Sequence, residues 1–151
     1  MAIKEFINFG DDGLQLGFNV SSTVGTGGRN HRGDVMLIQA IFNYLSSSPG
    51  VVSYQFKNTV MPEVNGKFSP ATGELIQKYQ TKWVHVVLRA DGVIHPASYK
   101  NRVLADRRAS RRLMTITLLH EHANQAAAEI GDSDYTEAIL FMFPHLSVWV
   151  G

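Results

Sequence analysis

The chain has 151 residues, 44% of them hydrophobic, which suits a single globular domain with one sizeable core. Fourteen basic and thirteen acidic residues give a formal net charge of +1, so the composition carries no sign of a polyanion-binding protein. The absence of cysteine excludes disulfides, thiolate metal sites and a cysteine nucleophile.

The first residues, MAIKEFINFGDDG, lack the apolar run and the small-residue cleavage site of a secretory signal. No stretch approaches the ~18 consecutive apolar residues that a membrane span needs. We therefore expect no membrane span and a cytoplasmic location before any export. If the protein acts in the periplasm or beyond its own cell, we expect a secretion system that does not depend on a signal peptide.

A weak alternation of apolar and polar residues over positions 3–24 predicts a β-hairpin or two short strands. The glycine-rich segment VGTGGRNHRGD (24–34) follows. It has neither the GxGxxG spacing of a dinucleotide-binding turn nor the Lys-Ser/Thr of a P-loop. We therefore favour a tightly turned or mobile loop over a phosphate site.

Apolar residues recur at helical spacing after this loop. They predict a helix from Val35 to about Leu45, with Asp34 as its N-cap. Residues 51–61 alternate weakly and are predicted to form a strand or a hairpin. A second helix is predicted over about 70–82.

The later part of the chain is predicted to hold two more helices. Residues 84–88 (VHVVL) are short and rich in β-branched residues, which predicts a helix tail or a strand. A third helix is expected after Pro96. A longer helix is expected from Ser110 to Gly131, with an inward stripe of Leu113, Ile116, Leu119, Ala123, Ala126 or Ala127, and Ile130.

The tail, residues 135–150, is too apolar to remain in solvent. Two arrangements satisfy this demand. The tail can pack on the chain's own helices and end in a strand that pairs with the N-terminal one, which we favour, or it can form an interface with a partner protein.

One turn sequence occurs twice, 26 positions apart. The first copy is Asn65-Gly66-Lys67-Phe68-Ser69-Pro70-Ala71-Thr72, and the second is Asp91-Gly92-Val93-Ile94-His95-Pro96-Ala97-Ser98. In each copy, Asn-Gly or Asp-Gly predicts a turn and the next apolar residue anchors it to a core. A cap position and a proline then begin a helix. Two copies are too few for a solenoid, so they predict two similar corners of one small helical unit.

These turns, with Asp34-Val35…Gln39…Phe42 before them and Ile76…Tyr79-Gln80 between them, resemble the peptidoglycan-binding-like module of cell-wall hydrolases and their relatives. The resemblance covers residues 34–99. The glycine-rich lead-in is similar to that of a subset from Gram-negative bacteria, some of which travel with type VI secretion. Ser69 and His95 stand where the family has glycines.

The resemblance implies a mainly α fold. It consists of a three-helix peptidoglycan-binding-like core, an N-terminal β-hairpin or short strands, and a C-terminal helical extension. We predict one domain over residues 1–151. Its parts are a strand and loop segment (1–33), the core (34–104) and the extension (105–151).

The sequence offers little for catalysis. His120 and His122 are two positions apart, about 200° around a helix, so they cannot face one metal ion, and we expect them at the surface or at the edge of the core. Glu63 and Glu74 form a glycosidase pair only by counting. We expect no enzymatic activity, no catalytic residue, no metal and no cofactor.

Two polar features have a structural interpretation. Gln39 and Gln80 are expected to bond the backbone amides of the neighbouring turns rather than to contact a ligand directly. The arginine-rich run at 102–112 could meet an anionic partner, but the near-zero net charge and the lack of interleaved aromatic residues favour a solvated junction between helices, without nucleic acid.

Two functions fit this picture. The first is a non-catalytic module that binds peptidoglycan glycan or stem peptide and serves as part of an antibacterial secretion effector system. Its ligand-binding side chains are expected to be Asn43, Tyr54, Lys78, Trp83 and Arg89. The second is a protein-interaction adaptor or structural component of a contractile secretion or phage-derived apparatus, which would contact its partner through the C-terminal extension.

Overall fold

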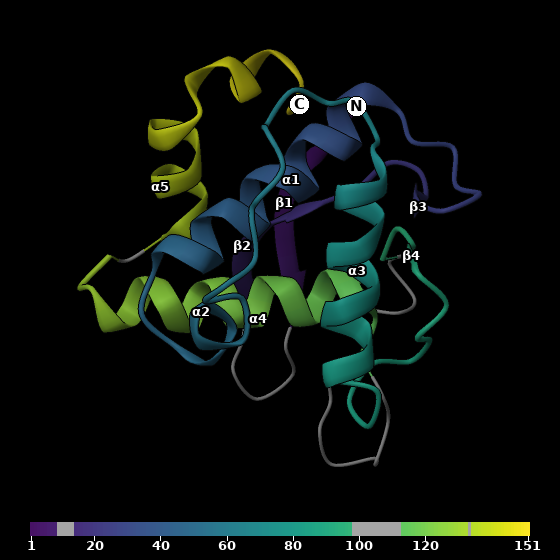
Figure 1. Cartoon of the computed structure of the whole chain (residues 1–151). Coiled ribbons are helices and arrows are strands. Elements are labelled where there is room, and N and C mark those ends of the chain that lie inside the picture. Colours follow the sequence, from purple (N-terminus) through teal and green to yellow (C-terminus); the bar gives the residue numbers. More distant parts are fainter. Residues whose placement is uncertain (9–13, 98–112, 133) are drawn as a thin grey trace.

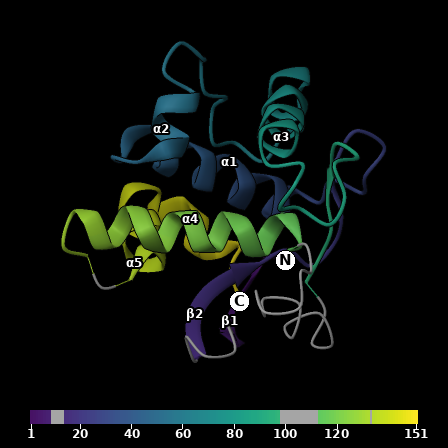
Figure 2. The same ribbon diagram turned by 90° about the horizontal axis from the view of Figure 1, so that it is seen from below.

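The computed structural model of the chain describes residues 1–8, 14–97, 113–132 and 134–151. In this part the fold is mainly helical, with two small antiparallel sheets. Helix α4 (Thr115–Glu129) packs against α1 (Arg32–Ser47) and α5 (Tyr135–Met142) (Figure 1). Figure 2 shows α4 between α1 on one side and the hairpin of β1 (Ile3–Asn8) and β2 (Leu14–Asn19) on the other.

The N-terminal segment forms the predicted β-hairpin. β1 and β2 pair antiparallel, from Ile3 opposite Asn19 to Asn8 opposite Leu14. Phe18 on β2 is fully buried and meets the edge of the Tyr135 ring, with 5.9 Å between ring centroids. This contact joins the hairpin to the C-terminal part of the chain.

Helix α1 confirms the first predicted helix, but Asp34 does not cap it. The helix begins at Arg32, so Asp34 lies inside its first turn and is fully buried. The Asp34 carboxylate accepts four hydrogen bonds, at 2.7–3.0 Å, from the backbone N–H and hydroxyl groups of Ser21 and Ser22. It therefore fixes the segment after β2 onto α1 instead of satisfying the helix's own amides.

The strand or hairpin predicted over residues 51–61 is wrong, because the segment opens with helix α2 (Val51–Gln55). Val52 and Phe56, four positions apart, are both buried. The Phe56 ring meets that of Phe42 on α1 edge to face, at 5.8 Å between centroids. Two anchors at helical spacing outweigh a weak alternation that has no sheet to join.

Helix α3 (Pro70–Lys82) confirms the second predicted helix. Its N-cap is Ser69, whose hydroxyl accepts a hydrogen bond from the Thr72 N–H at 3.3 Å, and Pro70 occupies the first helical position. The segment 84–88 continues as turns rather than as a helix, and Val87 then forms an isolated parallel bridge with Leu113.

The repeated turn forms two corners of similar geometry. Gly66 and Gly92 both have φ +76°, a left-handed conformation that favours glycine. After the second corner, β4 (Val93–Ile94) pairs antiparallel with β3 (Val24–Gly25). Ile94 is fully buried as expected.

The first corner is anchored less deeply than predicted, since Phe68 is only partly buried, against Gly73 of α3. After the second corner, Pro96 and Ala97 are not helical. The third helix expected after Pro96, together with the arginine-rich run at 102–112, lies outside the described residues.

The longer helix expected from Ser110 is α4. Its described part begins at Thr115, and Leu113 lies before it in the bridge to Val87. Ile130 does not complete the buried stripe: it follows the last helical residue and is half exposed. Gly131, at φ +80°, ends the helix as predicted.

The apolar tail packs on its own chain, as we favoured. It forms α5 and the 3-10 helix η4 (Pro144–Val148), and Tyr135, Ile139 and Leu146 are fully buried. Val150 then makes a parallel bridge with Ala2, which brings the two termini together (Figure 1). None of the helices that the structure describes has both the length and the apolar character needed to cross a membrane.

Candidate functional site

The two histidines of α4 are buried, contrary to the surface or core-edge positions expected for them. His120 is 1% exposed and His122 is 8% exposed. The ring atom His120 Nδ1 lies 2.7 Å from the Tyr135 hydroxyl, and His122 Nδ1 lies 2.7 Å from the Tyr79 hydroxyl. Each histidine thus faces a buried tyrosine from another helix.

His120 lies in a network of polar side chains. The Tyr135 hydroxyl accepts a hydrogen bond from the Phe18 N–H at 3.0 Å and also contacts His120 Nδ1. On the other side of the ring, His120 Nε2 lies 3.0 Å from Asn124 Nδ2 and 3.3 Å from Gln15 Oε1. Burial lowers the pKa of His120 to about 4, against a partial opposing effect of Asp134, and burial lowers the pKa of His122 to about 4.

Both rings are therefore neutral at neutral pH and take part in the packing and hydrogen bonding of the core. They lie about half a helical turn apart and have different partners, so they do not converge on one ion. No group of three metal-ligating side chains that could hold an ion occurs among the described residues.

Gln39 and Gln80 hold the two corners, as predicted. Gln39 Oε1 accepts from the N–H groups of Asn65 and Gly66 at 3.1 and 2.9 Å, while Gln39 Nε2 donates to the Lys67 carbonyl at 3.0 Å. Gln80 repeats this clamp at the second corner.

At that second corner, Gln80 Oε1 accepts from the Gly92 N–H at 2.7 Å, and Gln80 Nε2 donates to the Val93 carbonyl at 3.0 Å. Gln80 Nε2 also reaches Thr115 Oγ1 of α4 at 3.0 Å, in the same way that Gln39 Nε2 reaches Thr72 Oγ1 at 3.2 Å. The two corners therefore share one hydrogen-bond design.

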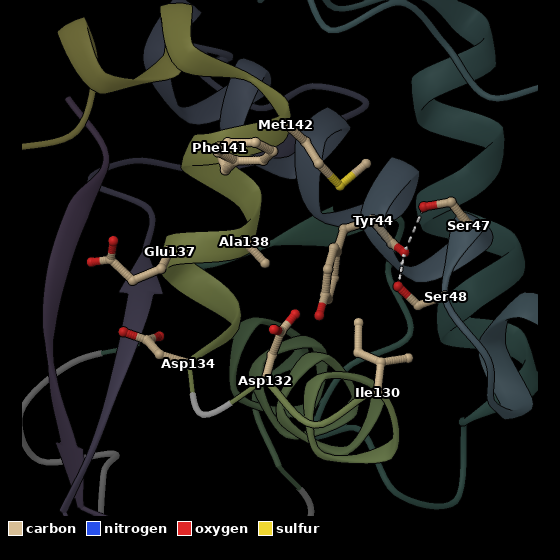
Figure 3. A pocket seen from close by; sticks show the side chains of 10 residues that line it. All are labelled: Tyr44, Ser47, Ser48, Ile130, Asp132, Asp134, Glu137, Ala138, Phe141 and Met142. Atoms are coloured by element: carbon tan, nitrogen blue, oxygen red, sulfur yellow. Dashed lines mark hydrogen bonds between the residues drawn. The ribbon is translucent and has the colours of Figure 1, made fainter.

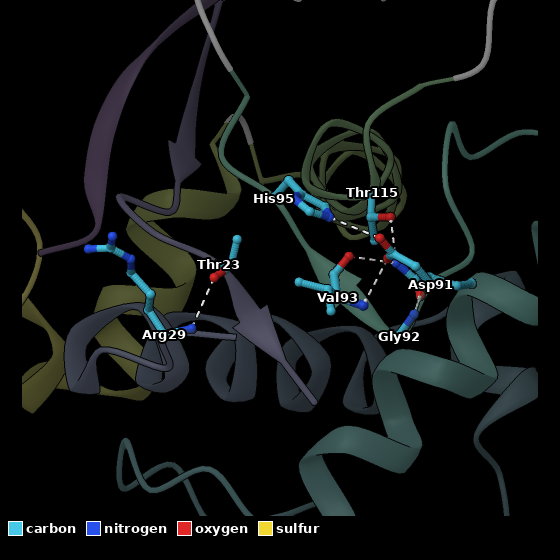
Figure 4. A network of polar contacts seen from close by, with 8 residues as sticks. Thr23, Arg29, Asp91, Gly92, Val93, His95 and Thr115 are labelled. Carbon is cyan, nitrogen blue, oxygen red and sulfur yellow. Dashed lines mark hydrogen bonds and ion pairs between the residues drawn. The ribbon is translucent and has the colours of Figure 1, made fainter. Parts of the chain in front are cut away.

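Asp91 makes two further side-chain contacts at the second corner, with Val93 and His95 (Figure 4). Asp91 Oδ1 accepts from the Val93 N–H at 3.0 Å, and Asp91 Oδ2 lies 3.0 Å from His95 Nε2. Burial alone would raise the pKa of Asp91, but the hydrogen bonds from His95 and Val93 outweigh it and leave this pKa below its ordinary value.

The five side chains expected to bind a ligand are spread over several elements. Asn43 on α1 donates to the carbonyl groups of Gln39 and Pro62, so its amide is used within the fold. Lys78 on α3 donates to Thr59 Oγ1 at 3.2 Å, and Arg89 is exposed.

Tyr54 and Trp83 offer the aromatic surface. Tyr54 on α2 is 80% exposed, and its neighbour Gln55 donates to the Lys78 carbonyl, so α2 and α3 touch beside it. Trp83, just after α3, is partly buried, with its ring centroid 4.7 Å from that of His122. The Trp83 Nε1 atom is buried and makes no hydrogen bond in the described part of the chain.

Two cavities lie elsewhere in the described part of the chain, and none of these five side chains lines either of them. The smaller, about 60 Å³, lies beside α2 and α4. The larger, about 570 Å³, lies between the C-terminal part of α1, the end of α4, and α5 (Figure 3). We treat this larger space as a candidate binding site and name it the acidic cavity, because its lining includes Asp132, Asp134 and Glu137.

The acidic cavity was not predicted from the sequence. Its three carboxylates lie close together in the sequence, after the end of one helix and at the start of the next, and this cluster could have indicated a negatively charged site. Its other polar members, Tyr44, Ser47 and Ser48, come from α1 and the residue after it, more than eighty positions earlier, and no pattern in the sequence pairs the two segments. Burial, followed by the nearby charge of Asp132, raises the pKa of Tyr44, and the neighbouring Ser48 hydroxyl offsets this in part.

Comparison of the chain with protein-family models, with curated proteins and with solved structures finds no match.

Proposed function

We propose that the chain is a non-catalytic module that binds the bacterial cell wall, with the three-helix peptidoglycan-binding-like core suggested by its sequence. The observation that carries this proposal is the pair of corners clamped by Gln39 and Gln80. The repeated motif of the resembling family thus coincides with a repeated physical design. Under this proposal the chain would serve as a targeting part of an antibacterial secretion system.

The ligand would lie against α2 and the C-terminal half of α3. Tyr54 is the most exposed aromatic side chain of the expected set, and Lys78 lies on the helix that touches α2. Trp83 follows at the end of the same helix. An aromatic face beside polar groups suits a sugar ring or an amide plane, which present one apolar face and several hydrogen-bonding edges.

The test is co-sedimentation of the full chain with purified insoluble sacculi. We expect the protein to leave the supernatant, and Tyr54→Ala to weaken binding about fivefold to thirtyfold, since an aromatic contact in a binding site is worth about 1–2 kcal/mol. Phe141→Ala is the matched control, because Phe141 is equally exposed but lies on α5.

The same incubation should release no soluble muropeptides, with or without added zinc. Failure of the protein to sediment with sacculi, or equal losses of binding in Tyr54→Ala and Phe141→Ala, would count against the cell-wall proposal.

A second candidate function, contact with a protein partner, is favoured by a separate observation: apolar side chains of α5 remain exposed beside the acidic cavity.

A further inference from the structure

The acidic cavity has carboxylates and no basic side chain in its lining. Glu137 pairs with Lys4 at 3.1 Å, and one oxygen of Asp134 caps α5 by accepting from the Thr136 N–H at 2.9 Å. The carboxylate of Asp132 makes no hydrogen bond or ion pair with the described residues. The cavity therefore keeps an uncompensated negative charge.

The end of α4 adds to this negative potential. The C-terminus of a helix carries a partial negative charge from its unpaired carbonyl groups, which basic side chains usually offset. The last turn of α4 contains no basic residue, and Asp132 follows only three positions after its last residue, Glu129. A cation placed here would interact favourably with both the carboxylate and the helix end.

The floor of the cavity contains an unsatisfied hydroxyl. Tyr44 is 2% exposed, and its hydroxyl oxygen makes no hydrogen bond in the part of the chain that the structure describes. Figure 3 shows the Tyr44 ring directed toward Asp132. A buried polar atom without a partner is uncommon, and this one can accept a hydrogen bond from an ammonium or guanidinium group.

Two serines provide further acceptors. The Ser47 and Ser48 hydroxyls donate to the Tyr44 backbone carbonyl at 3.1 and 2.6 Å (Figure 3). Because each proton is used in this way, the serine oxygen atoms have only lone pairs to offer to an occupant. Apart from the Tyr44 hydroxyl, which can also donate, the polar lining thus consists of acceptors, which suits a cationic donor.

The rim indicates the size of the occupant. Phe141 is 88% exposed, Ile130 is 50% exposed and Met142 is 43% exposed, and all three flank the cavity. A small amine would neutralise the carboxylate charge but leave these side chains in water. A polypeptide segment with apolar residues beside its cation would cover them.

We propose that the acidic cavity is the docking site for a lysine or arginine side chain that an apolar segment of a partner protein presents. The cation lies against Asp132 and the Tyr44 hydroxyl, and the flanking apolar residues cover Phe141, Ile130 and Met142. This site is separate from the surface of α2 and α3 proposed to bind the cell wall, so either proposal can fail alone.

The test is an NMR titration of the ¹⁵N-labelled full chain with the peptide acetyl-Leu-Lys-Leu-amide at millimolar concentration. We expect shifts at the amides of α5 and of Tyr44. The analogue with norleucine in place of lysine, which keeps the aliphatic stem without the ammonium, should bind at least about fivefold more weakly. Asp132→Asn should weaken the lysine peptide to a similar extent, and Glu74→Gln, which removes one exposed charge from α3, should leave its binding unchanged.

Several results would overturn the proposal. They are absence of shifts with the lysine peptide, equal binding of the norleucine analogue, or equal effects of the Asp132→Asn and Glu74→Gln variants. Binding of n-butylammonium as strong as that of the peptide would identify a site for small amines instead. A dimer in light scattering that Asp132→Asn dissociates would identify a second copy of this chain as the occupant.

Discussion

Gln80 connects three parts of the molecule through one side-chain amide. It lies on α3, holds the corner at Gly92 and Val93, and reaches Thr115 at the start of α4. Gln80→Leu would keep the volume and leave these buried groups without partners. We expect a loss of about 3 kcal/mol in the free energy of unfolding, which lowers the melting temperature of a chain of this size by about 10 °C.

Gln77→Leu is the control for this prediction, measured by the same thermal and urea unfolding. Gln77 is exposed on the same helix, and among the described residues its side chain makes one weak hydrogen bond, at 3.4 Å to Thr81 Oγ1. It should change the free energy of unfolding by less than about 0.5 kcal/mol. If the two variants lost equal stability, the clamp would have no special role.

The sequence predicted the role of Gln39 and Gln80 because both ends of each interaction were visible in it. A glutamine on an apolar helical face and a turn with unpaired amides define the clamp together. The predicted role of Asp34 as N-cap was wrong. An aspartate that can cap a helix can equally accept hydrogen bonds from a preceding segment, and here Ser21 and Ser22 donate to it instead. Two partners of His120, Gln15 and Tyr135, come from other elements, so no local pattern could reveal them.

At the scale of elements, α4 makes stability depend on pH through its two histidines. Both have a pKa of about 4 in the folded chain, against an ordinary 6.5 that the unfolded chain restores. Their folded pKa is depressed, so their contribution is fully present above about pH 6.5 and is lost as pH falls toward 4. By pH 5 the loss amounts to about 2 kcal/mol for each histidine.

The measurement is the urea midpoint at pH 7.5 and at pH 5. The double variant His120→Gln, His122→Gln should be less stable at pH 7.5, but its midpoint should change much less between the two pH values. His145→Gln, at an exposed position, should retain the full pH dependence. An unchanged wild-type midpoint at pH 5 would contradict the neutral, buried state of the α4 histidines.

Helices could be predicted from the sequence where the helical spacing of apolar residues agreed with the positions of capping residues. α1, α3 and α4 have long apolar stripes, and Ser69-Pro70 marks the start of α3 correctly. α2 was missed because a helix of five residues shows barely more than one turn of spacing, and its two anchors depend on a facing surface of α1. The acidic cavity was missed for a related reason: it exists only where three helices meet.

For the whole molecule, the tail is a structural part of the core. Removal of residues 135–151 withdraws Tyr135, Ile139 and Leu146, each fully buried. At about 1.5–3 kcal/mol for each side chain, the loss is comparable with the whole net stability of a domain. We expect the truncated chain to lose its cooperative thermal transition and to aggregate.

Circular dichroism melting and light scattering would check this expectation. The control is Phe141→Ser in the full chain, which changes the same segment at a position 88% exposed and should leave the melting temperature nearly unchanged. A truncated chain that is monomeric and melts cooperatively would show instead that the tail serves an interface.

The bridge between Ala2 and Val150 has a consequence for the order of folding. Ala2 and Lys4 donate backbone hydrogen bonds to the carbonyl groups of Trp149 and Gly151, at 3.1 Å each. Residues 2–4 therefore cannot form these backbone hydrogen bonds until residues 149–151 are present. The entropy of closing so long a loop grows only with the logarithm of its length, about 4 kcal/mol here, but such non-local contacts form slowly. During synthesis on the ribosome, the edge of β1 and the face of α4 that packs against α5 therefore stay uncovered until residues 135–151 have been made, so the nascent chain exposes these surfaces while residues 1–134 are being translated.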